Sequence, residues 1–256
     1  MGSCFARNIA EYLKSKEYNY LVTEAPFKQA SAHWDQVFNT ACMRQVFEYT
    51  FYDDWCPLVR WWPRNENVQD PFRRNIIYNK QTCVLNFAHH REASYEALKE
   101  AEVIILTLGL IETWRDKRDQ MTYYRVPSPR IYDSNIHEFY VQSVQDCLTD
   151  LDKIHAILQD QNPRAIIITT VSPVPMFASF RTDVDVVTAN SLSKSTLRVA
   201  AEYLSQQHRN VYYFPAYEIV TQGVANPYDD DNRHVTKDAV DKVMEVFESQ
   251  FVSETT

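Results

Sequence analysis

Hydrophobic residues of this 256-residue chain gather in short continuous runs, and longer stretches with a helical period lie between them. Two runs, VIILTLG (103–109) and AIIITTV (165–171), are almost wholly aliphatic or β-branched. This pattern is typical of a parallel strand that is buried on both faces. NVYYFP (210–215) predicts a third strand and YNYLVT (18–23) a weaker fourth. The runs therefore predict a mainly parallel sheet.

Amphipathic stretches between the runs predict helices. The clearest is 235–251, where apolar residues recur on one stripe, as in a helix packed on a sheet: Val240, Val243, Met244, Phe247 and Phe251. Three more helices are predicted over 5–16, 135–159 and 193–207. Strands that alternate with helices predict one doubly wound α/β domain over residues 1–256.

Residues 51–92 interrupt this alternation. Their first part, FYDDWCPLVRWWPRNENVQDPFRRN, is rich in Trp, Pro, Arg and Asn and has no clear period. We expect an aromatic-rich excursion over the carboxyl ends of the strands, where open α/β sheets bind ligands. Trp55, Trp61 and Trp62 either stack on a sugar ring or pack the excursion against the domain, and packing is the favoured interpretation.

Charge and cysteine usage narrow the function classes. The net charge is −8, so the chain lacks the excess of basic residues that binding to nucleic-acid phosphates requires. No apolar run approaches the roughly 18 residues of a membrane span, and the polar stretch after Arg7 argues against a signal peptide. The cysteines form no CxxC pair, so we expect neither a disulfide framework nor a zinc site: Cys4, Cys42, Cys56, Cys83 and Cys147. These features predict a reduced, cytoplasmic protein without nucleic-acid or membrane partners.

The chain opens MGSCFA although it holds only three glycines. Gly2 permits a tight turn, and Ser3 then stands at the start of the first helix, where free N–H groups favour an oxyanion. Ser3 is therefore a candidate nucleophile. The alternative is that Ser3 caps the helix that begins near Phe5. Cys4 is a less favoured nucleophile, because the next residue on a turn points elsewhere.

A second motif, NPYDDDNRHV, precedes the last predicted helix. Asp231 and His234 are three residues apart, so one short turn can hold the carboxylate beside the imidazole whose tautomer it fixes. The alternative is a solvated cap, with Thr236 or Asp231 in that role. A calcium loop is excluded because the required glycine and distal glutamate are absent.

Residues 2–6 read GSCFA, the motif that names the GSCFA family, which is related to the SGNH (GDSL-like) esterases. The resemblance extends in order through DPFR (70–73), TLGLIETW (107–114), TVSPVP (170–175), NSLSKSTLR (190–198) and YFPAYEI (213–219). It implies a three-layer α/β/α sandwich, Ser3 as nucleophile, His234 as general base and Asp231 as its orienting partner, and no cofactor or metal. Members enter GSCFA through a buried strand, so we expect a sheet that lacks its first strand and an amino terminus that frays.

The oxyanion donors are less defined. Gly109 follows a strand where SGNH enzymes place an asparagine, but this chain has Glu112 there, which we expect to hold a neighbouring loop. Asn39 is the best side-chain donor, and its alternative role is to cap the helix that follows. The backbone N–H of Ser3 is the preferred oxyanion contact. Ser172 is a candidate pocket wall or merely part of a turn.

Two further pairs of polar residues are weighed. His89 and His90 lack acidic or thiol partners for a metal, so a surface or cap role is favoured. Ser193 and Lys194 lie in a family-like segment. We expect Lys194 to be a residue at the start of its helix that pairs with the excursion, and not a catalytic base.

The function expected from these residues is hydrolysis of a carboxylic ester, including O-acyl groups on a carbohydrate, through a Ser-His-Asp triad and an acyl-enzyme. Transfer of the acyl group to a sugar hydroxyl and glycan binding without catalysis are the two alternatives. Water exclusion would favour transfer. The expected partner is a small-molecule or carbohydrate ester.

Overall fold

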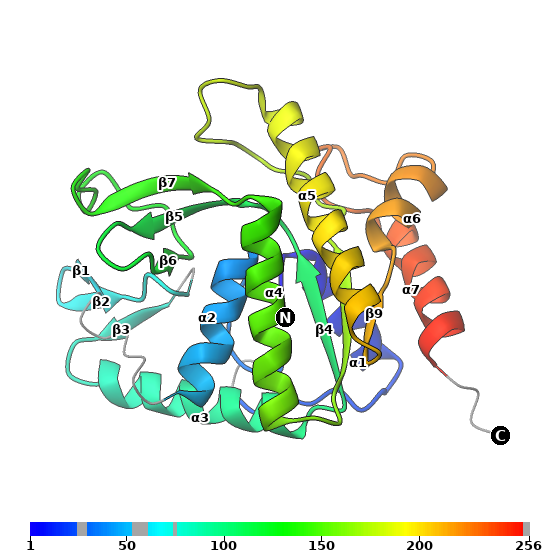
Figure 1. The fold of residues 1–256 in the computed structure, drawn as a ribbon, viewed down its shortest axis with the longest axis horizontal. Coiled ribbons are helices and arrows are strands. Elements are labelled where there is room, and N and C mark those ends of the chain that lie inside the picture. The colour runs from blue at the N-terminus through cyan, green and yellow to red at the C-terminus, as the bar shows by residue number, and fades with distance from the viewer. Residues whose placement is uncertain (25–29, 53–60, 74–75, 253–256) are drawn as a thin grey trace.

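The two aliphatic runs form the centre of the computed structural model, which describes residues 1–24, 30–52, 61–73 and 76–252. Strand β4 (Val103–Leu108) pairs in parallel with β8 (Ile166–Val171), and β9 (Val211–Tyr213) follows in parallel on the other side of β8. The order is therefore β4–β8–β9, with β4 at the edge (Figure 1). The three predicted strands are confirmed.

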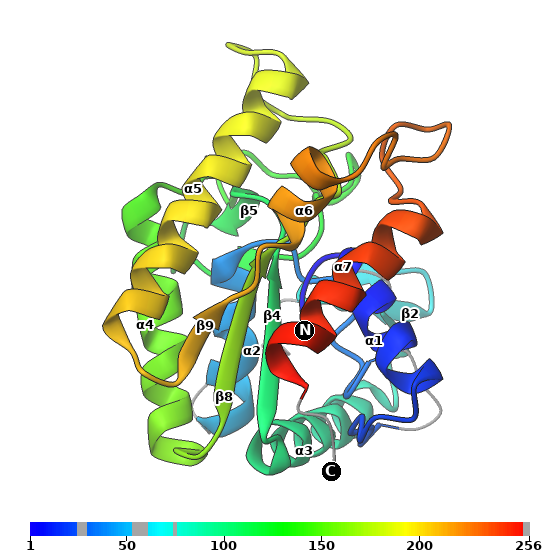
Figure 2. The ribbon, with the colours of Figure 1, turned by 90° about the vertical axis from the view of Figure 1, so that its right-hand side faces the viewer.

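Helices pack on both faces of this sheet (Figure 2). Successive side chains of a strand point to opposite faces, so Leu106 and Ile167 join one hydrophobic cluster and Ile168 joins another. The first cluster includes residues of α2 (Thr40–Phe51), α3 (Cys83–Glu100), α4 (Val144–Gln161) and α5 (Val186–Gln207). The second includes residues of α1 (Phe5–Ser15), α6 (Ala216–Gly223) and α7 (Lys237–Phe251). The chain is thus a mixed α/β protein built on a parallel sheet.

The helix predicted over 135–159 is wrong in its first part. Residues His137–Val141 form strand β7, which pairs antiparallel with β5 (Glu112–Asp116) in a second sheet of order β6–β5–β7, where β6 is Thr122–Tyr123. The helix starts only after Ser143, whose side chain and that of Asp146 form a capping box. That cap separates the two elements.

The excursion also contains regular structure. Strands β1 (Trp62–Arg64), β2 (Asn67–Gln69) and β3 (Ile77–Asn79) form an antiparallel meander, and α3 follows it. Strands of three residues are too short to show a period, and α3 exposes Val84 and Leu85, which blurs its apolar stripe. Trp55 and Cys56 lie outside the described residues.

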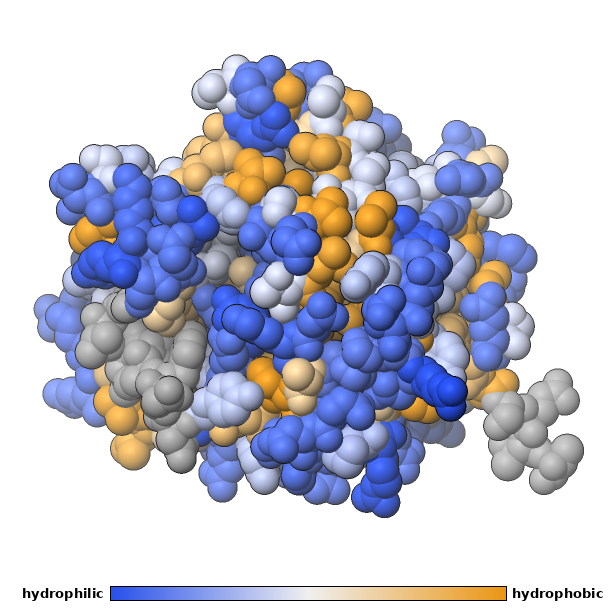
Figure 3. All heavy atoms as spheres, viewed as in Figure 1, coloured by the Kyte–Doolittle hydropathy of each residue, from blue (hydrophilic) through white to orange (hydrophobic). Residues whose placement is uncertain are grey.

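Two more predicted elements differ from the structure. Residues 18–23 carry no regular secondary structure, and 18–21 line a groove instead. Helix α5 begins seven residues before the predicted 193, capped by Asp185. Its added turns expose Val187 and Leu192, so they do not share the buried stripe that marks the rest of the helix. Apolar residues are visible on the molecular surface in the region of α5 (Figure 3).

The amino terminus does not fray, contrary to expectation. Gly2 forms a parallel bridge with Thr107 of β4, the Thr107 N–H donates to the Met1 carbonyl at 2.9 Å and the Ser3 N–H donates to the Thr107 carbonyl at 3.1 Å. Sheet pairing therefore fixes the turn before α1. In the described part of the chain, no helix combines the length and apolar character needed to cross a membrane.

Candidate active site

Ser3 lies where the carboxyl end of β4 meets the start of α1. Gly2 has φ +145°, and a Cβ there would be 2.3 Å from the Thr107 carbonyl oxygen. A Cβ on Gly109 would lie 2.9 Å from the Phe38 carbonyl oxygen and 3.3 Å from the Ser3 Cβ. Two of the three glycines therefore adjoin Ser3 where no side chain fits.

The Ser3 hydroxyl is buried and has no hydrogen-bond partner among the described residues. Cys4, not Ser3, occupies the N-cap position of α1, and no side chain caps this helix. The capping role considered for Ser3 is therefore wrong. A buried hydroxyl without a partner at a helix start is available to a ligand.

The backbone N–H groups of Ser3 and Gly109, the two candidate residues on either side of this turn, are already bonded. The Ser3 N–H donates to Thr107, and the Gly109 N–H donates to the Phe38 carbonyl at 2.9 Å. The expectation that the Ser3 N–H faces a developing oxyanion is thus corrected, because the parallel pairing of the terminus uses it. The first N–H groups of a helix have no intrahelical acceptor, so those of Cys4 and Phe5 are better placed.

Asp231 and His234 form the pair that their spacing predicts. One carboxylate oxygen of Asp231 accepts the N–H groups of Arg233 and His234, both at 2.9 Å, and the other lies 2.5 Å from His234 Nδ1. The backbone bonds from His234 and Arg233 are the main reason that the pKa of Asp231 is lowered to about 2. Thr236 caps α7, so the Asp231 carboxylate does not serve as the cap and instead holds His234. Because Nδ1 of His234 faces Asp231, its Nε2 points away from the carboxylate.

The two motifs lie near the same end of the parallel sheet, where its strands have their carboxyl ends. The Tyr228 hydroxyl, in the loop that carries Asp231 and His234, donates to the carbonyl of Pro173 just after β8 at 3.0 Å. Phe5 and Val235, which follow the two motifs closely, belong to one hydrophobic cluster. The His234 side chain is 65% exposed and makes no hydrogen bond to Ser3. The structure thus brings Asp231 to His234 and leaves Ser3 unbonded.

Comparison with known families decides the assignment. The model of the GSCFA family matches residues 1–247. The chain belongs to the GSCFA family. No curated protein matches it. In this GSCFA chain the naming residues 2–6 are the turn between the β4 pairing and α1, so the motif coincides with the glycine-dependent geometry around Ser3.

The remaining candidates of the GSCFA chain have local partners. Asn39 caps α2, since its side chain accepts the Cys42 N–H at 2.8 Å. Glu112 accepts the Ser179 hydroxyl at 2.7 Å and so holds the loop after β8. Ser172 is buried, and its hydroxyl accepts the Val174 N–H at 3.3 Å, which makes it a turn residue.

Lys194 differs most from its prediction. It lies inside α5 and is 1% exposed, with Nζ donating to the carbonyls of Gly109 and Val174, both at 2.9 Å. No carboxylate pairs with it in the described part of the chain, and burial lowers its pKa to about 7. Lys194 therefore ties together the segments that follow β4 and β8.

A small cavity of about 120 Å³ lies beside Ser3, and one of its lining residues is a histidine that belongs to no sequence motif. His33 lines it together with Cys4, Arg7 and Asp35. Burial lowers the pKa of His33, so its imidazole is mostly neutral at pH 7. The segment around His33 has no recognisable spacing, so only the fold reveals this neighbour.

The other histidines and the tryptophans have structural roles. His90 is buried, not a surface residue, with Nδ1 2.7 Å from Glu24 and Nε2 2.9 Å from the Tyr49 hydroxyl, whereas His89 is exposed. Trp61 stacks on Tyr78, and Trp62 packs on Tyr123, as the packing interpretation predicts. Across the described ranges, no three His, Cys, Asp or Glu side chains could hold a metal ion together.

Proposed function

We propose that this GSCFA chain is a serine hydrolase of the SGNH type that cleaves a carboxylic ester. The observation that carries the proposal is the preformed Asp231–His234 pair near the carboxyl ends of the parallel strands. At the same end of the sheet, the buried Ser3 hydroxyl has no partner among the described residues. A serine nucleophile needs a base, and the base needs an orienting carboxylate. The helices on both faces of the parallel sheet support the finer assignment, a three-layer α/β/α sandwich.

In the proposed reaction, Ser3 Oγ attacks the ester carbonyl while His234 Nε2 takes the hydroxyl proton. His234 returns that proton to the leaving alcohol, and an acyl group remains on Ser3. Water then attacks the acyl-enzyme with His234 again as base, which releases the carboxylic acid and restores Ser3. Asp231 holds the imidazole tautomer throughout and stabilises its cationic form. The reaction requires that His234 Nε2 reach Ser3 Oγ in the substrate complex.

The free N–H groups at the start of α1 would stabilise the tetrahedral oxyanion, together with the positive end of the helix dipole. The four described cysteines are free thiols, which supports a reducing, cytoplasmic compartment. Glycan O-acyl esters are the proposed substrate class, and transfer of the acyl group to a sugar hydroxyl is the alternative outcome of the same acyl-enzyme.

Turnover of p-nitrophenyl acetate tests the proposal. Asp231→Asn should reduce kcat at least 100-fold, because it removes the group that fixes the imidazole tautomer. Asp230→Asn is the matched control, since Asp230 is an exposed neighbour in the same loop, and should retain full turnover. Equal turnover in both variants would contradict the triad. Turnover that appears only with an added sugar acceptor would assign the chain as an acyltransferase.

A further inference from the structure

Ser3 lies between β4 and a small cavity. The Ser3 N–H donates to the Thr107 carbonyl of β4 at 3.1 Å, and the Gly2 carbonyl accepts the Val37 N–H at 2.8 Å. These two groups of the turn belong to one planar trans peptide, so they point in opposite directions. The segment that leads to Val37 therefore runs on the side of the turn away from β4. Residues 33–36 of this segment form one wall of the cavity of about 120 Å³, and the turn forms another.

The loop that carries the candidate base is attached on the other side of Ser3. Tyr228 of this loop bonds to the Pro173 carbonyl just after β8, and β8 pairs with β4 on the side away from Gly2. In the proposed reaction His234 returns a proton to the leaving alcohol, so the alcohol lies on the β8 side of Ser3. The acyl group that stays on Ser3 is then directed to the opposite side, where the cavity lies.

We propose that this cavity is the acyl subsite of the hydrolase and that it admits an uncharged acyl group of about two to four carbons. The inference rests on the proposed function, because it requires that Ser3 form the acyl-enzyme. A cavity of about 150 Å³ holds benzene, which has six heavy atoms. By the same measure a cavity of about 120 Å³ holds about five heavy atoms. Acetyl has three heavy atoms and butyryl five, whereas octanoyl has nine.

The chemistry of the lining agrees with a short and uncharged group. The wall includes the polar side chains of His33, Asp35 and Gln36, so a long alkyl chain would gain little from burial there. Asp35 and Arg7 have opposite charges, and burial lowers the pKa of His33. The lining side chains therefore carry no net charge at pH 7 that would attract an acyl group with a second carboxylate.

Buried charges hold the wall in place. The His33 N–H donates to the Glu24 carboxylate at 2.6 Å, and the Arg73 guanidinium donates to the His33 carbonyl at 2.9 Å. Both Glu24 and Arg73 are buried. If His33 moved outward, these two charged groups would lose hydrogen bonds in the interior, which is costly. The fold therefore fixes the size of the cavity.

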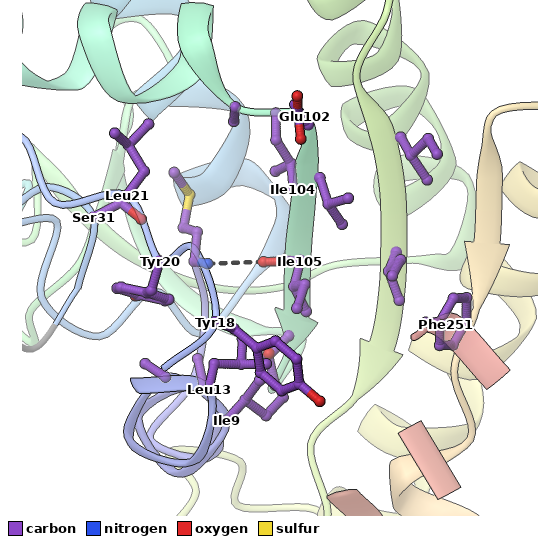
Figure 4. A pocket seen from close by; sticks show the side chains of 18 of the residues that line it. Ile9, Leu13, Tyr18, Tyr20, Leu21, Ser31, Glu102, Ile104, Ile105 and Phe251 are labelled. Carbon is purple, nitrogen blue, oxygen red and sulfur yellow. Dashed lines mark hydrogen bonds between the residues drawn. The ribbon is translucent and has the colours of Figure 1, made fainter. Parts of the chain in front are cut away.

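A second space limits the cavity at its other end. A groove of about 890 Å³ runs along β4, and most of the side chains that line it are apolar or aromatic (Figure 4). Tyr20, Ser31 and Trp34 line both the groove and the cavity. Figure 4 shows Tyr20 and Ser31 on the side of the groove away from Ile105 of β4. These side chains lie between the two spaces, so the acyl subsite ends at them.

Hydrolysis of p-nitrophenyl acetate, butyrate and octanoate tests the size limit, with kcat/KM as the readout. Acetate and butyrate should be within about 10-fold of each other, and octanoate at least about 100-fold below butyrate, because its four additional methylenes do not fit. A kcat/KM for octanoate that equals or exceeds that for butyrate would overturn the acyl subsite and leave the hydrolase in place. Failure to hydrolyse any of the three esters would overturn the proposed function, and the subsite with it.

His33→Ala tests whether the acyl group binds in this cavity. The substitution removes the five ring atoms of the imidazole from the wall, so the ratio of kcat/KM for octanoate to that for acetate should rise at least about 10-fold. His89→Ala is the matched control, since His89 is exposed and lies outside the cavity lining, and it should keep the wild-type ratio. The ratio within one variant does not depend on the fraction of folded enzyme. An unchanged ratio in His33→Ala would overturn the proposal.

Discussion

Replacing Lys194 by methionine tests the most unusual charge in the structure. Burial without a carboxylate partner lowers the pKa of Lys194 from 10.5 to about 7. Because one pH unit corresponds to about 1.4 kcal/mol, the folded state disfavours the charged form by about 5 kcal/mol. Methionine has a similar length and no charge. It also leaves the Gly109 and Val174 carbonyls without their donor, which costs about 1–3 kcal/mol for each group. At pH 7 the stability gained by removing the buried amine and the stability lost with its two hydrogen bonds largely offset each other.

The pH dependence of the free energy of unfolding separates the effect of the lowered pKa from that of the lost hydrogen bonds. Between pH 7 and pH 9 the unfolded chain holds a proton on Lys194 that the folded chain has lost, so the free energy of unfolding rises with pH. The wild-type protein should therefore gain about 2 to 3 kcal/mol over Lys194→Met across this range. Urea unfolding of both proteins at each pH measures the difference, and other titrating groups cancel in the comparison. A difference that stays constant within about 0.5 kcal/mol would refute the inference that burial lowers the pKa of Lys194.

Three further predictions concern the turn, the helix cap and the buried histidine. Gly2→Ala should lower the melting temperature sharply because its Cβ would overlap the Thr107 carbonyl, whereas Gly223→Ala, with nothing within 4 Å among the described residues, should not; equal melting temperatures would contradict the geometry. Asn39→Ala should cost about 1 kcal/mol in urea unfolding and Asn39→Ser almost nothing, since serine keeps the cap; a 100-fold loss of turnover in Asn39→Ser would instead show an oxyanion donor. Burial lowers the pKa of His90 to about 4, so stability should fall as the pH falls from 6.5 toward 4, and a His90→Gln variant with the same fall would rule this out.

The centre of the fold could be predicted because its strands are covered on both faces. Residues 103–108 and 166–171 are nearly continuous runs of aliphatic and β-branched residues for that reason. Strand β7 could not be separated from α4 by pattern, because HEFYV is amphipathic in either conformation and only the Ser143 cap marks the break. The strands of the meander are too short for any periodicity to appear.

The candidate site also contains residues that the sequence predicts and residues that it does not. Asp231 and His234 are close in sequence, so their contact follows from a single turn. Ser3 was marked by a rare glycine, but its hydrogen bonding depends on the pairing of the terminus with β4, which lies 100 residues away. The burial of Lys194 and the position of His33 depend on how distant segments meet, and neither residue lies in an informative pattern.

Reaction with a fluorophosphonate probe tests the central claim most directly. The probe phosphonylates a serine that a neighbouring base activates, and mass spectrometry of the digested protein identifies the modified residue. We predict one adduct, on Ser3, which is lost in Ser3→Ala and strongly reduced in His234→Gln but retained in Cys4→Ser. An adduct that persists in Ser3→Ala, or a wild-type protein that forms none under conditions that label a known serine esterase, would contradict the assignment of Ser3 as the nucleophile.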